Sequence, residues 1–173
     1  STIDTAILIA GVLAAAQFFD QPDEEEIRTL ADQLYRRVDW RWALNRGALL
    51  THGWHPRRGF IKHRWQGYNE ALLLYILALG SPTFPIDPSS YLAWTETYEW
   101  GIFCGQEYLY AGPLFTHQLS HCWIDFRGIQ DRFMREHGID YFENSRRATY
   151  AQRRYAIDNP RELSQAQVIM DVL

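Results

Sequence analysis

The first strongly patterned segment is an uncharged run from Thr5 to Phe19 in which apolar residues fall on every side of a helical projection. Small residues such as Ala6 and Ala10 allow close helix packing, while Leu8 and Phe18 supply apolar bulk. A helix that is apolar all round is typical of a buried position. We therefore expect a helix over this run that is buried on most sides.

The second patterned segment starts at Pro22 and has the opposite character. Pro22 and the acidic residues that follow it suit a helical first turn, where the dipole is positive. Apolar side chains then recur at helical spacing, at Ile27, Leu30, Leu34 and Val38. This pattern predicts an amphipathic outer helix.

Glycine, proline and tryptophan interrupt the stretch from Asp39 to Gly67. Ala48–Trp54 and Phe60–Trp65 read as two short strands, and residues 55–59 join them as a hairpin turn. Next, Asn69–Leu79 is predicted to be a helix with Asn69 as its N-cap and Glu70 as its first residue. This helix is almost wholly apolar, so we expect it to be buried.

Shorter elements follow in the rest of the chain. A capping box formed by Asp140 and Glu143 begins a long helix that reaches about Ile157. The remaining predictions are helices from Ser89 or Ser90 to Tyr98, over Pro113–Ile124, over Ile129–Glu136 and over Leu163–Val172, with an extended or irregular segment over Trp100–Ala111. The protein is therefore predicted to be mainly α-helical, and the absence of a βαβ pattern argues against a parallel nucleotide-binding sheet.

Composition narrows the classes of function. The chain has 173 residues, which fits one domain. Its net charge of −4 argues against a nucleic-acid partner. The fifteen residues of Thr5–Phe19 are too few to span a bilayer, which needs about 20, so no membrane partner is expected. Cys104 and Cys122 cannot form a disulfide framework, although a single bridge between them stays open, and we expect both to be small buried apolar residues.

The candidate chemistry centres on the segment from Trp65 to Glu70, which places a carboxyl group directly after two aromatic residues. Aromatic rings stack on the C–H faces of sugars, and glycoside hydrolysis needs a protonated carboxyl group beside the leaving oxygen. Glu70 fits that acid if burial raises its pKa, although a helix start acts in the opposite direction. The alternative is that Glu70, like Asp4 at the start of the first helix, only complements a helix dipole.

Two further groups of residues allow more than one interpretation. His117, His121 and Asp125 follow each other at intervals of four and would share one helical face. They could bind a metal, but the glutamate of the HExxH motif is absent, and lining a polar or sugar-binding pocket is the alternative. Four arginines at positions 146, 147, 153 and 154 are expected to form a solvated helix face.

Several long motifs resemble the bacterial glucoamylase-like domain family, which includes endo-β-1,2-glucanases and domains of cyclic β-1,2-glucan synthases. They are STIDTAIL at residues 1–8, DWRW at 39–42, GWHPRRGF at 53–60, WQGYNEA at 65–71, YILALGSPT at 75–83, GPLFTHQLSHCWIDFR at 112–127 and YFENSRRATYAQRRYAIDNP at 141–160. The resemblance therefore covers nearly all of residues 1–160.

The resemblance implies an (α/α)₆ barrel with short β-hairpin elements and a saccharide cleft at one end. Within it, Glu70 matches the general acid and Asp4 matches an acidic residue at the cleft, and both are the candidate catalytic residues. The residues that would line the sugar subsites are Trp42, Trp54, Trp65, Tyr68, His117, His121 and Arg127. The implied substrate is a β-glucan or its oligosaccharides, no cofactor or metal is implied, and the implied location is periplasmic or secreted.

The chain departs from the family in two ways. Its predicted helices amount to about half a barrel, and residues 161–173 diverge from the family pattern. We therefore expect one incomplete domain over residues 1–173 that self-associates or pairs with the rest of a barrel, because an open barrel edge exposes apolar surface. A second catalytic carboxylate can then lie outside this chain, and an inactive saccharide-binding or structural module is the alternative function.

Overall fold

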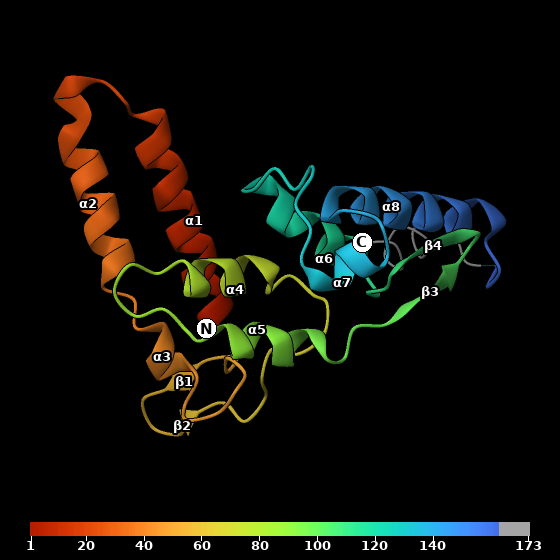
Figure 1. The fold of residues 1–173 in the computed structure, drawn as a ribbon, viewed down its shortest axis with the longest axis horizontal. Helices are drawn as coiled ribbons and strands as arrows, with labels where there is room; N and C mark the ends of the chain where they lie inside the picture. Colours follow the sequence, from red (N-terminus) through yellow and green to blue (C-terminus); the bar gives the residue numbers. More distant parts are fainter. Residues whose placement is uncertain (163–173) are drawn as a thin grey trace. The chain divides into compact units, whose positions relative to one another are not determined.

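A computed structural model describes residues 1–162 of the chain, and these residues are mainly α-helical (Figure 1). They form two compact units. The first unit comprises residues 1–66 and 71–96, and the second comprises residues 67–70 and the chain from Thr97 onward.

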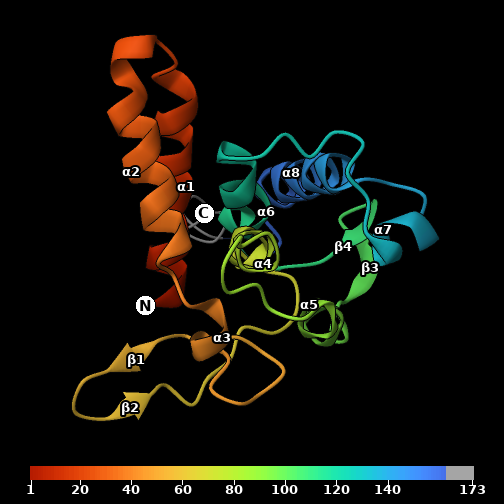
Figure 2. The same ribbon diagram turned by 60° about the vertical axis from the view of Figure 1, so that its left-hand side comes forward.

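The first unit is built on a pair of adjacent helices, α1 (Thr2–Phe18) and α2 (Glu25–Arg36), which Figures 1 and 2 both show side by side. A short 3-10 helix, Pro22–Glu24, connects them. The Ser1 hydroxyl caps α1 by accepting a hydrogen bond from the amide of Asp4. The buried side of α1 is lined by small residues such as Ala6 and Ala10, so neighbouring backbones can approach closely.

The burial of these two helices differs from the prediction. Leu8 and Phe18 of α1 are 65% and 79% exposed, so the expectation that α1 is buried on most sides is wrong for this chain. Ile27, Leu30 and Leu34 of α2 are also exposed. A helix that is apolar on all sides needs neighbours on all sides, and within the first unit the helices that pack most extensively against α1 are α2 and α4.

Helix α4 (Leu72–Leu79) forms the core of the first unit, and the prediction that it is buried is confirmed. Tyr75 is fully buried within it and stacks on Trp94 of α5 (Pro88–Thr95) at a centroid distance of 5.0 Å. The Tyr75 hydroxyl donates to the carbonyl of Trp65 and accepts from the amide of Leu50, which ties α4 to the preceding loops.

A loop between α3 (Trp40–Ala43) and the first hairpin is organised around one arginine. The Arg64 guanidinium donates to the carbonyl oxygens of Leu44, Leu49 and Asn45. A Cβ atom at Gly47 would lie 2.5 Å from Arg64 Nη1, so any larger residue there would have to displace the guanidinium.

The predicted hairpin is confirmed, with shorter strands than expected. Strands β1 (Trp54–His55) and β2 (Gly59–Phe60) pair antiparallel, and a separate bridge joins Thr51 to Arg64. The Arg58 amide donates to the His55 carbonyl at 3.1 Å, and Gly59 has a φ of +72°. This is the geometry of a three-residue loop in which a turn is followed by a left-handed glycine.

The second unit contains a second hairpin, of strands β3 (Trp100–Phe103) and β4 (Gln106–Leu109), which the sequence did not predict. Helix α8 (Tyr141–Asp158) packs on β4. The fully buried Asn144 side chain accepts from the Leu109 amide at 2.7 Å and donates to the Leu109 carbonyl at 3.3 Å. One side chain therefore satisfies both backbone groups of that strand residue.

The capping box of α8 is confirmed at its central contact, because the Asp140 carboxylate accepts from the Glu143 amide at 2.7 Å. The other helices of this unit are shorter than predicted. The Pro113–Ile124 segment consists of α6 (Leu114–Gln118) and a 3-10 helix (Leu119–Cys122), and the Ile129–Glu136 segment contains α7 (Arg132–Glu136). The predicted helix over Leu163–Val172 lies outside the described residues.

Cys104 and Cys122 are free thiols and both are exposed, so the expectation that they are buried is wrong. Cys104 lies at the tip of the β3–β4 hairpin with a φ of +47°. Over residues 1–162, none of the helices combines the length and the apolar character that crossing a membrane requires.

Candidate functional site

The two units share the candidate site residues between them. Asp4, Trp42, Trp54 and Trp65 belong to the first unit, and Tyr68, Glu70, His117, His121 and Arg127 belong to the second. Each unit therefore carries its own group of candidates, and each group is described by itself.

Asp4 is an exposed carboxylate in the first turn of α1. It accepts a hydrogen bond of 2.8 Å from the Ser1 hydroxyl, and this bond lowers the pKa of the Asp4 carboxyl. Asp4 is therefore ionised at neutral pH, as a general base has to be, and its position is also the one expected of a first-turn dipole partner.

Trp42 and Trp54 belong to an aromatic cluster beside the β1–β2 hairpin. Trp42 contacts Trp54 at a centroid distance of 5.9 Å and Phe60 at 4.5 Å. The two tryptophans remain 51% and 47% exposed, so each presents ring surface to solvent. Exposed indole surface of this kind is suited to stacking on a sugar ring.

Trp65 is held more firmly than the other candidate tryptophans. Its ring stacks on His52 at a centroid distance of 4.0 Å, and its indole N–H donates to the Thr2 hydroxyl at 3.0 Å. Because these contacts occupy a ring face and the polar edge, Trp65 connects the first hairpin to the start of α1.

Glu70 is half-buried and lies in the turn before α4. The N-cap of α4 is Ala71, so the prediction that Asn69 caps the helix and that Glu70 is its first residue is wrong. Among residues 1–162 the Glu70 carboxylate forms no ion pair, and its backbone carbonyl accepts from the Ser120 hydroxyl at 3.5 Å. The Glu70 carboxylate therefore takes part in no salt bridge within the described residues.

Tyr68, two residues before Glu70, is the centre of a buried aromatic cluster. Its ring contacts Tyr98 and Tyr141 at 5.8 Å each and His117 at 5.2 Å. Burial raises the pKa of the Tyr68 phenol, which therefore stays neutral. The cluster fixes the backbone immediately before Glu70 and so limits where its carboxylate can move.

His117 is almost completely buried beside Tyr68 and Tyr108. Its Nε2 lies 3.2 Å from the carbonyl oxygen of Ala111, so Nε2 carries the proton and donates. Its Nδ1 is buried and has no hydrogen-bond partner within the described residues. Burial lowers the pKa of His117 to about 4, so the ring is neutral at pH 7 and Nδ1 is an unused acceptor.

His121 and Arg127 line a cavity of about 310 Å³, together with Cys122, Trp123, Ile124, Asp125, Phe126 and Phe142. Burial lowers the pKa of His121, against the opposing charges of Asp125 and Asp140. Arg127 pairs with Asp125 at 3.4 Å and lies over the Phe142 ring at 5.3 Å. The cavity thus combines aromatic surface with an imidazole and an exposed ion pair.

Sequence reasoning missed Trp123 and Phe142 in this cavity. Trp123 lies inside the GPLFTHQLSHCWIDFR motif, two residues after His121, so that motif held the available signal. Phe142 is the second residue of α8 and lies inside the motif of residues 141–160, so that motif held the available signal for this residue.

The metal hypothesis for His117, His121 and Asp125 required a continuous helix, and the structure does not provide one. The α-helix ends at Gln118, and Asp125 lies beyond the 3-10 helix that follows. Across the part of the chain that the structure describes, no group of three His, Cys, Asp or Glu side chains could hold a metal ion.

A half-buried carboxylate close to aromatic side chains supplies two of the features that glycoside hydrolysis uses. A family profile described as "Glycoamylase: Putative glucoamylase" matches residues 62–167, more than half of the chain. The chain therefore belongs to this glucoamylase family.

Relatives of known name or structure agree with this assignment. An exo β-1,2-glucooligosaccharide sophorohydrolase (non-reducing end) of Parabacteroides distasonis is 28% identical over 187 residues, which cover 91% of this chain and 25% of that protein. A crystal structure of a putative glucoamylase from Bacteroides caccae has a TM-score of 0.83 and 30% identity. An endo-β-1,2-glucanase from Chitinophaga pinensis, in complex with sophorotriose and glucose, has a TM-score of 0.80 and 26% identity.

This chain matches only part of each relative. The match to the Bacteroides caccae structure and the match to the Chitinophaga pinensis structure each cover 95% of this chain but only 42% of the other chain. It thus spans a quarter to two-fifths of the proteins to which it is similar.

Proposed function

We propose that the chain is part of a glycoside hydrolase domain that acts on β-glucan, with β-1,2-glucan as the candidate substrate. On this proposal the two units are a portion of an (α/α)₆ barrel. The observation that carries it is Glu70, a half-buried carboxylate without an ion-pair partner among the described residues, placed two residues after the buried Tyr68. The named activities of the relatives support the substrate class.

In the proposed mechanism Glu70 is the general acid. Its carboxyl proton passes to the glycosidic oxygen as the bond between that oxygen and the anomeric carbon breaks. A second carboxylate then either removes a proton from an attacking water or attacks the anomeric carbon itself. Asp4, which is ionised, is the candidate within this chain for that second carboxylate.

The remaining candidate residues are proposed to bind sugar. Trp42 and Trp54 offer exposed indole faces for stacking. His117 offers an unpaired Nδ1 acceptor for a substrate hydroxyl or an ordered water. His121 and Arg127 line the 310 Å³ cavity, where imidazole and guanidinium can hydrogen-bond to hydroxyl groups. Tyr68 and Trp65 are proposed to hold the surrounding backbone in place.

The test is Glu70→Gln in the complete protein, with release of reducing ends from linear β-1,2-glucan as the assay. General acid catalysis contributes about 10²–10⁴-fold, so we expect kcat to fall by that factor while sugar affinity changes little. Glu96→Gln, at the exposed C-cap of α5, is the matched control and should leave kcat unchanged. An unchanged kcat in Glu70→Gln would remove this residue from the mechanism.

A second candidate function is an inactive saccharide-binding or structural module. The exposed indole faces of Trp42 and Trp54 favour it, because stacking on a sugar ring does not itself require catalysis. Calorimetric titration of residues 1–173 with β-glucan oligosaccharides, paired with the reducing-end assay, separates the two functions. Binding without product formation supports the module.

We also propose that the exposed apolar surface of α1 and α2 is covered by self-association or by further helices of a barrel. Leu30 and Leu34 are 50% and 46% exposed on adjacent turns of α2. Substituting both by Gln should lower the mass that light scattering reports for residues 1–173. A wild-type chain that is a stable monomer at high concentration would contradict the self-association.

A further inference from the structure

Positive charge is concentrated around the β1–β2 hairpin. Residues 40–69 contain six Lys and Arg residues and no Asp or Glu, whereas the rest of the chain has eleven basic and twenty-one acidic residues. The six are Arg41, Arg46, Arg57, Arg58, Lys62 and Arg64. A chain with a net charge of −4 therefore carries one strongly basic segment.

Within the described residues, none of these six cations forms an ion pair with a carboxylate. The arginines that do so are Arg36, Arg127, Arg132, Arg146, Arg147 and Arg154, all outside the segment. Two of the six are used by the fold, since Arg41 donates to the Pro85 carbonyl and Arg64 to the loop carbonyls described above. Of the other four, Arg46 is exposed in the loop that precedes the hairpin. Arg57, Arg58 and Lys62 are exposed at the hairpin, and their side chains form no hydrogen bond with the described part of the chain.

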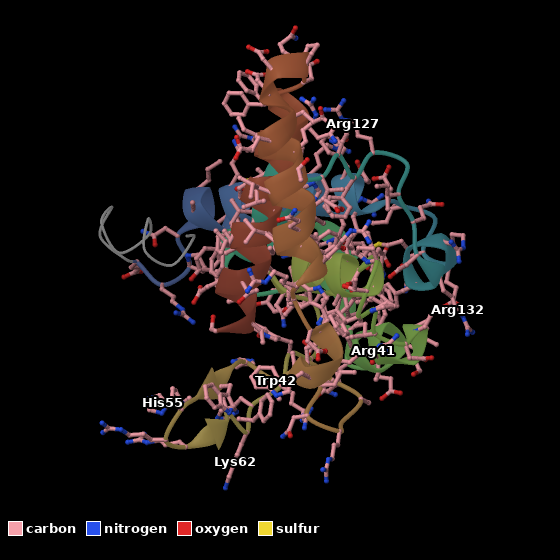
Figure 3. The ribbon with its side chains drawn as sticks, turned by 90° about the vertical axis from the view of Figure 1, so that its left-hand side faces the viewer. Arg41, Trp42, His55, Lys62, Arg127 and Arg132 are labelled. Carbon is pink, nitrogen blue, oxygen red and sulfur yellow. The ribbon has the colours of Figure 1, made fainter. Side chains whose placement is uncertain are left out.

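The fold presents these three cations, which we call the basic hairpin tip, on a well-defined backbone. Arg57 and Arg58 occupy the turn that the Arg58 amide closes, between Pro56 and the left-handed Gly59. Lys62 follows β2 and extends away from the ribbon, as Figure 3 shows. Because the turn is short and Pro56 restricts its backbone, little backbone freedom remains to be lost when a ligand binds.

The basic hairpin tip is close to the exposed tryptophans. Arg57 is three residues from Trp54, which at about 3.3 Å per residue puts the two Cα atoms no more than about 10 Å apart. Trp54 is in turn in contact with Trp42. One end of the first unit thus offers both indole faces for a sugar ring and unpaired cations for negative charge.

Taking the saccharide ligand from the proposed function, we infer that the basic hairpin tip binds acidic substituents of a glucan. The substituents would be carboxylate or phosphate groups attached to the sugar chain, held by Arg57, Arg58 and Lys62 while a ring stacks on Trp54 or Trp42. A neutral glucan needs the tryptophans alone and leaves three cations without a function. A nucleic acid would use the cations, but it would also meet the acidic remainder of the chain.

The test compares the affinity of residues 1–173 for linear β-1,2-glucan and for the same polymer after carboxymethylation, by isothermal titration calorimetry. The charged polymer should bind about tenfold more tightly at low ionic strength, and the preference should shrink in about 0.3 M salt. The triple variant Arg57→Gln, Arg58→Gln, Lys62→Gln should lose the preference while keeping its affinity for the neutral polymer.

Two controls make the result specific. The triple variant Arg37→Gln, Arg132→Gln, Arg153→Gln removes the same charge from exposed positions elsewhere and should keep the preference. The double variant Arg57→Lys, Arg58→Lys conserves the charge and should keep most of it. Circular dichroism melts that match the wild type verify that each variant is folded.

Equal binding of the neutral and charged polymers by the wild type would refute this inference and leave the proposed function standing. So would an equal loss in both triple variants. Tighter binding of duplex DNA or of anionic lipid vesicles than of carboxymethylated glucan would assign the surface to a different partner and refute it as well. Failure of both polymers to bind would refute the proposed function and this inference together.

Discussion

The buried histidine His117 predicts how the stability of the protein depends on pH. Its ring is 1% exposed, packs beside the rings of Tyr68 and Tyr108, and donates from Nε2 to the Ala111 carbonyl. Protonation would place a charge in this apolar site with no counterion in contact. Burial is therefore the main cause that lowers the pKa of His117 to about 4, and His121 adds a smaller effect in the same direction.

The lowered pKa of His117 determines the sign and the size of the change in stability with pH. An unfolded histidine has a pKa of about 6.5, so between pH 6.5 and 4 the unfolded chain binds a proton that the folded chain does not. The contribution of His117 to the free energy of unfolding is therefore fully present above pH 6.5 and falls as the pH drops toward 4. Below pH 4 this contribution no longer changes with pH. At 1.36 kcal/mol for each pKa unit, the loss is about 3 kcal/mol.

The assay is urea unfolding followed by circular dichroism at several pH values from 7 to 4. The variant His117→Gln keeps a side-chain N–H for the Ala111 carbonyl and cannot titrate in this range. We expect it to show a free energy of unfolding that is flatter with pH by about 3 kcal/mol. Other groups with shifted pKa values, such as Glu143, whose pKa Arg146 lowers to about 2, contribute equally in the wild type and in His117→Gln. Their contributions therefore cancel in the comparison of the two proteins.

His121→Gln is the matched control. Burial lowers the pKa of His121 as well, but this ring is only half-buried and lines an open cavity, so its contribution has the same sign and is smaller. If the wild type and His117→Gln lose the same free energy between pH 6.5 and 4, the His117 ring is not excluded from solvent as the structure describes. The account of the Tyr68 cluster as a rigid support for Glu70 would then fail too.

Two further predictions concern stability and use the same urea assay at pH 7. Gly47→Ala should lower the free energy of unfolding by about 1–3 kcal/mol, because the new methyl group displaces the Arg64 guanidinium from its carbonyl partners. The control is Gly112→Ala, whose new methyl group meets no atom within 4 Å, and it should change the free energy of unfolding by no more than about 0.5 kcal/mol. Asn144→Leu should lower the free energy of unfolding by about 2–5 kcal/mol, because it leaves the buried amide and carbonyl of Leu109 unpaired. A loss below about 1 kcal/mol would contradict the importance of the Asn144 side chain for joining α8 to β4.

Strong local signals in the sequence made some elements predictable. The long helix α8 carried its capping box, the α4 segment was apolar over eight residues, and residues 55–59 had the turn residues that a hairpin requires. Each signal acts within a few residues of the element it specifies. These elements form nearly where they were predicted because no distant contact has to decide between alternatives.

Other elements have a backbone geometry that the residue types in the sequence do not indicate. The β3–β4 hairpin turns at Cys104 and Gly105, both with positive φ, and cysteine is not a residue that marks such a turn. The helix after Pro113 changes to 3-10 geometry at Leu119, and there is no proline or glycine between Pro113 and Cys122 to mark the change. That change moves Asp125 off the helical face on which the metal hypothesis depended.

The candidate site was only partly predictable for a related reason. Residue type identified aromatic rings and carboxylates suited to sugars, but not which of them the fold would use for its own stability. Trp65 looked equivalent to Trp42 in the sequence, yet it is stacked on His52 and hydrogen-bonded to Thr2. Trp42 remains 51% exposed. Whether an aromatic ring is available to a ligand depends on long-range contacts, which only the folded chain reveals.

The exposed faces of α1 and α2 show what a hydrophobic pattern does and does not specify. The residues of α1 are apolar on all sides. This pattern predicts that every side of the helix is buried against a neighbour, but it does not indicate which segment that neighbour is. Residues 1–162 supply α2 and α4 as neighbours and leave Leu8 and Phe18 in solvent. On the association proposed above, further helices of a barrel or a second copy of the chain would cover these two side chains. Covering the two side chains would add an apolar contribution of about 1.5–3 kcal/mol for each, which is part of the driving force for the association that the α2 variants are designed to weaken.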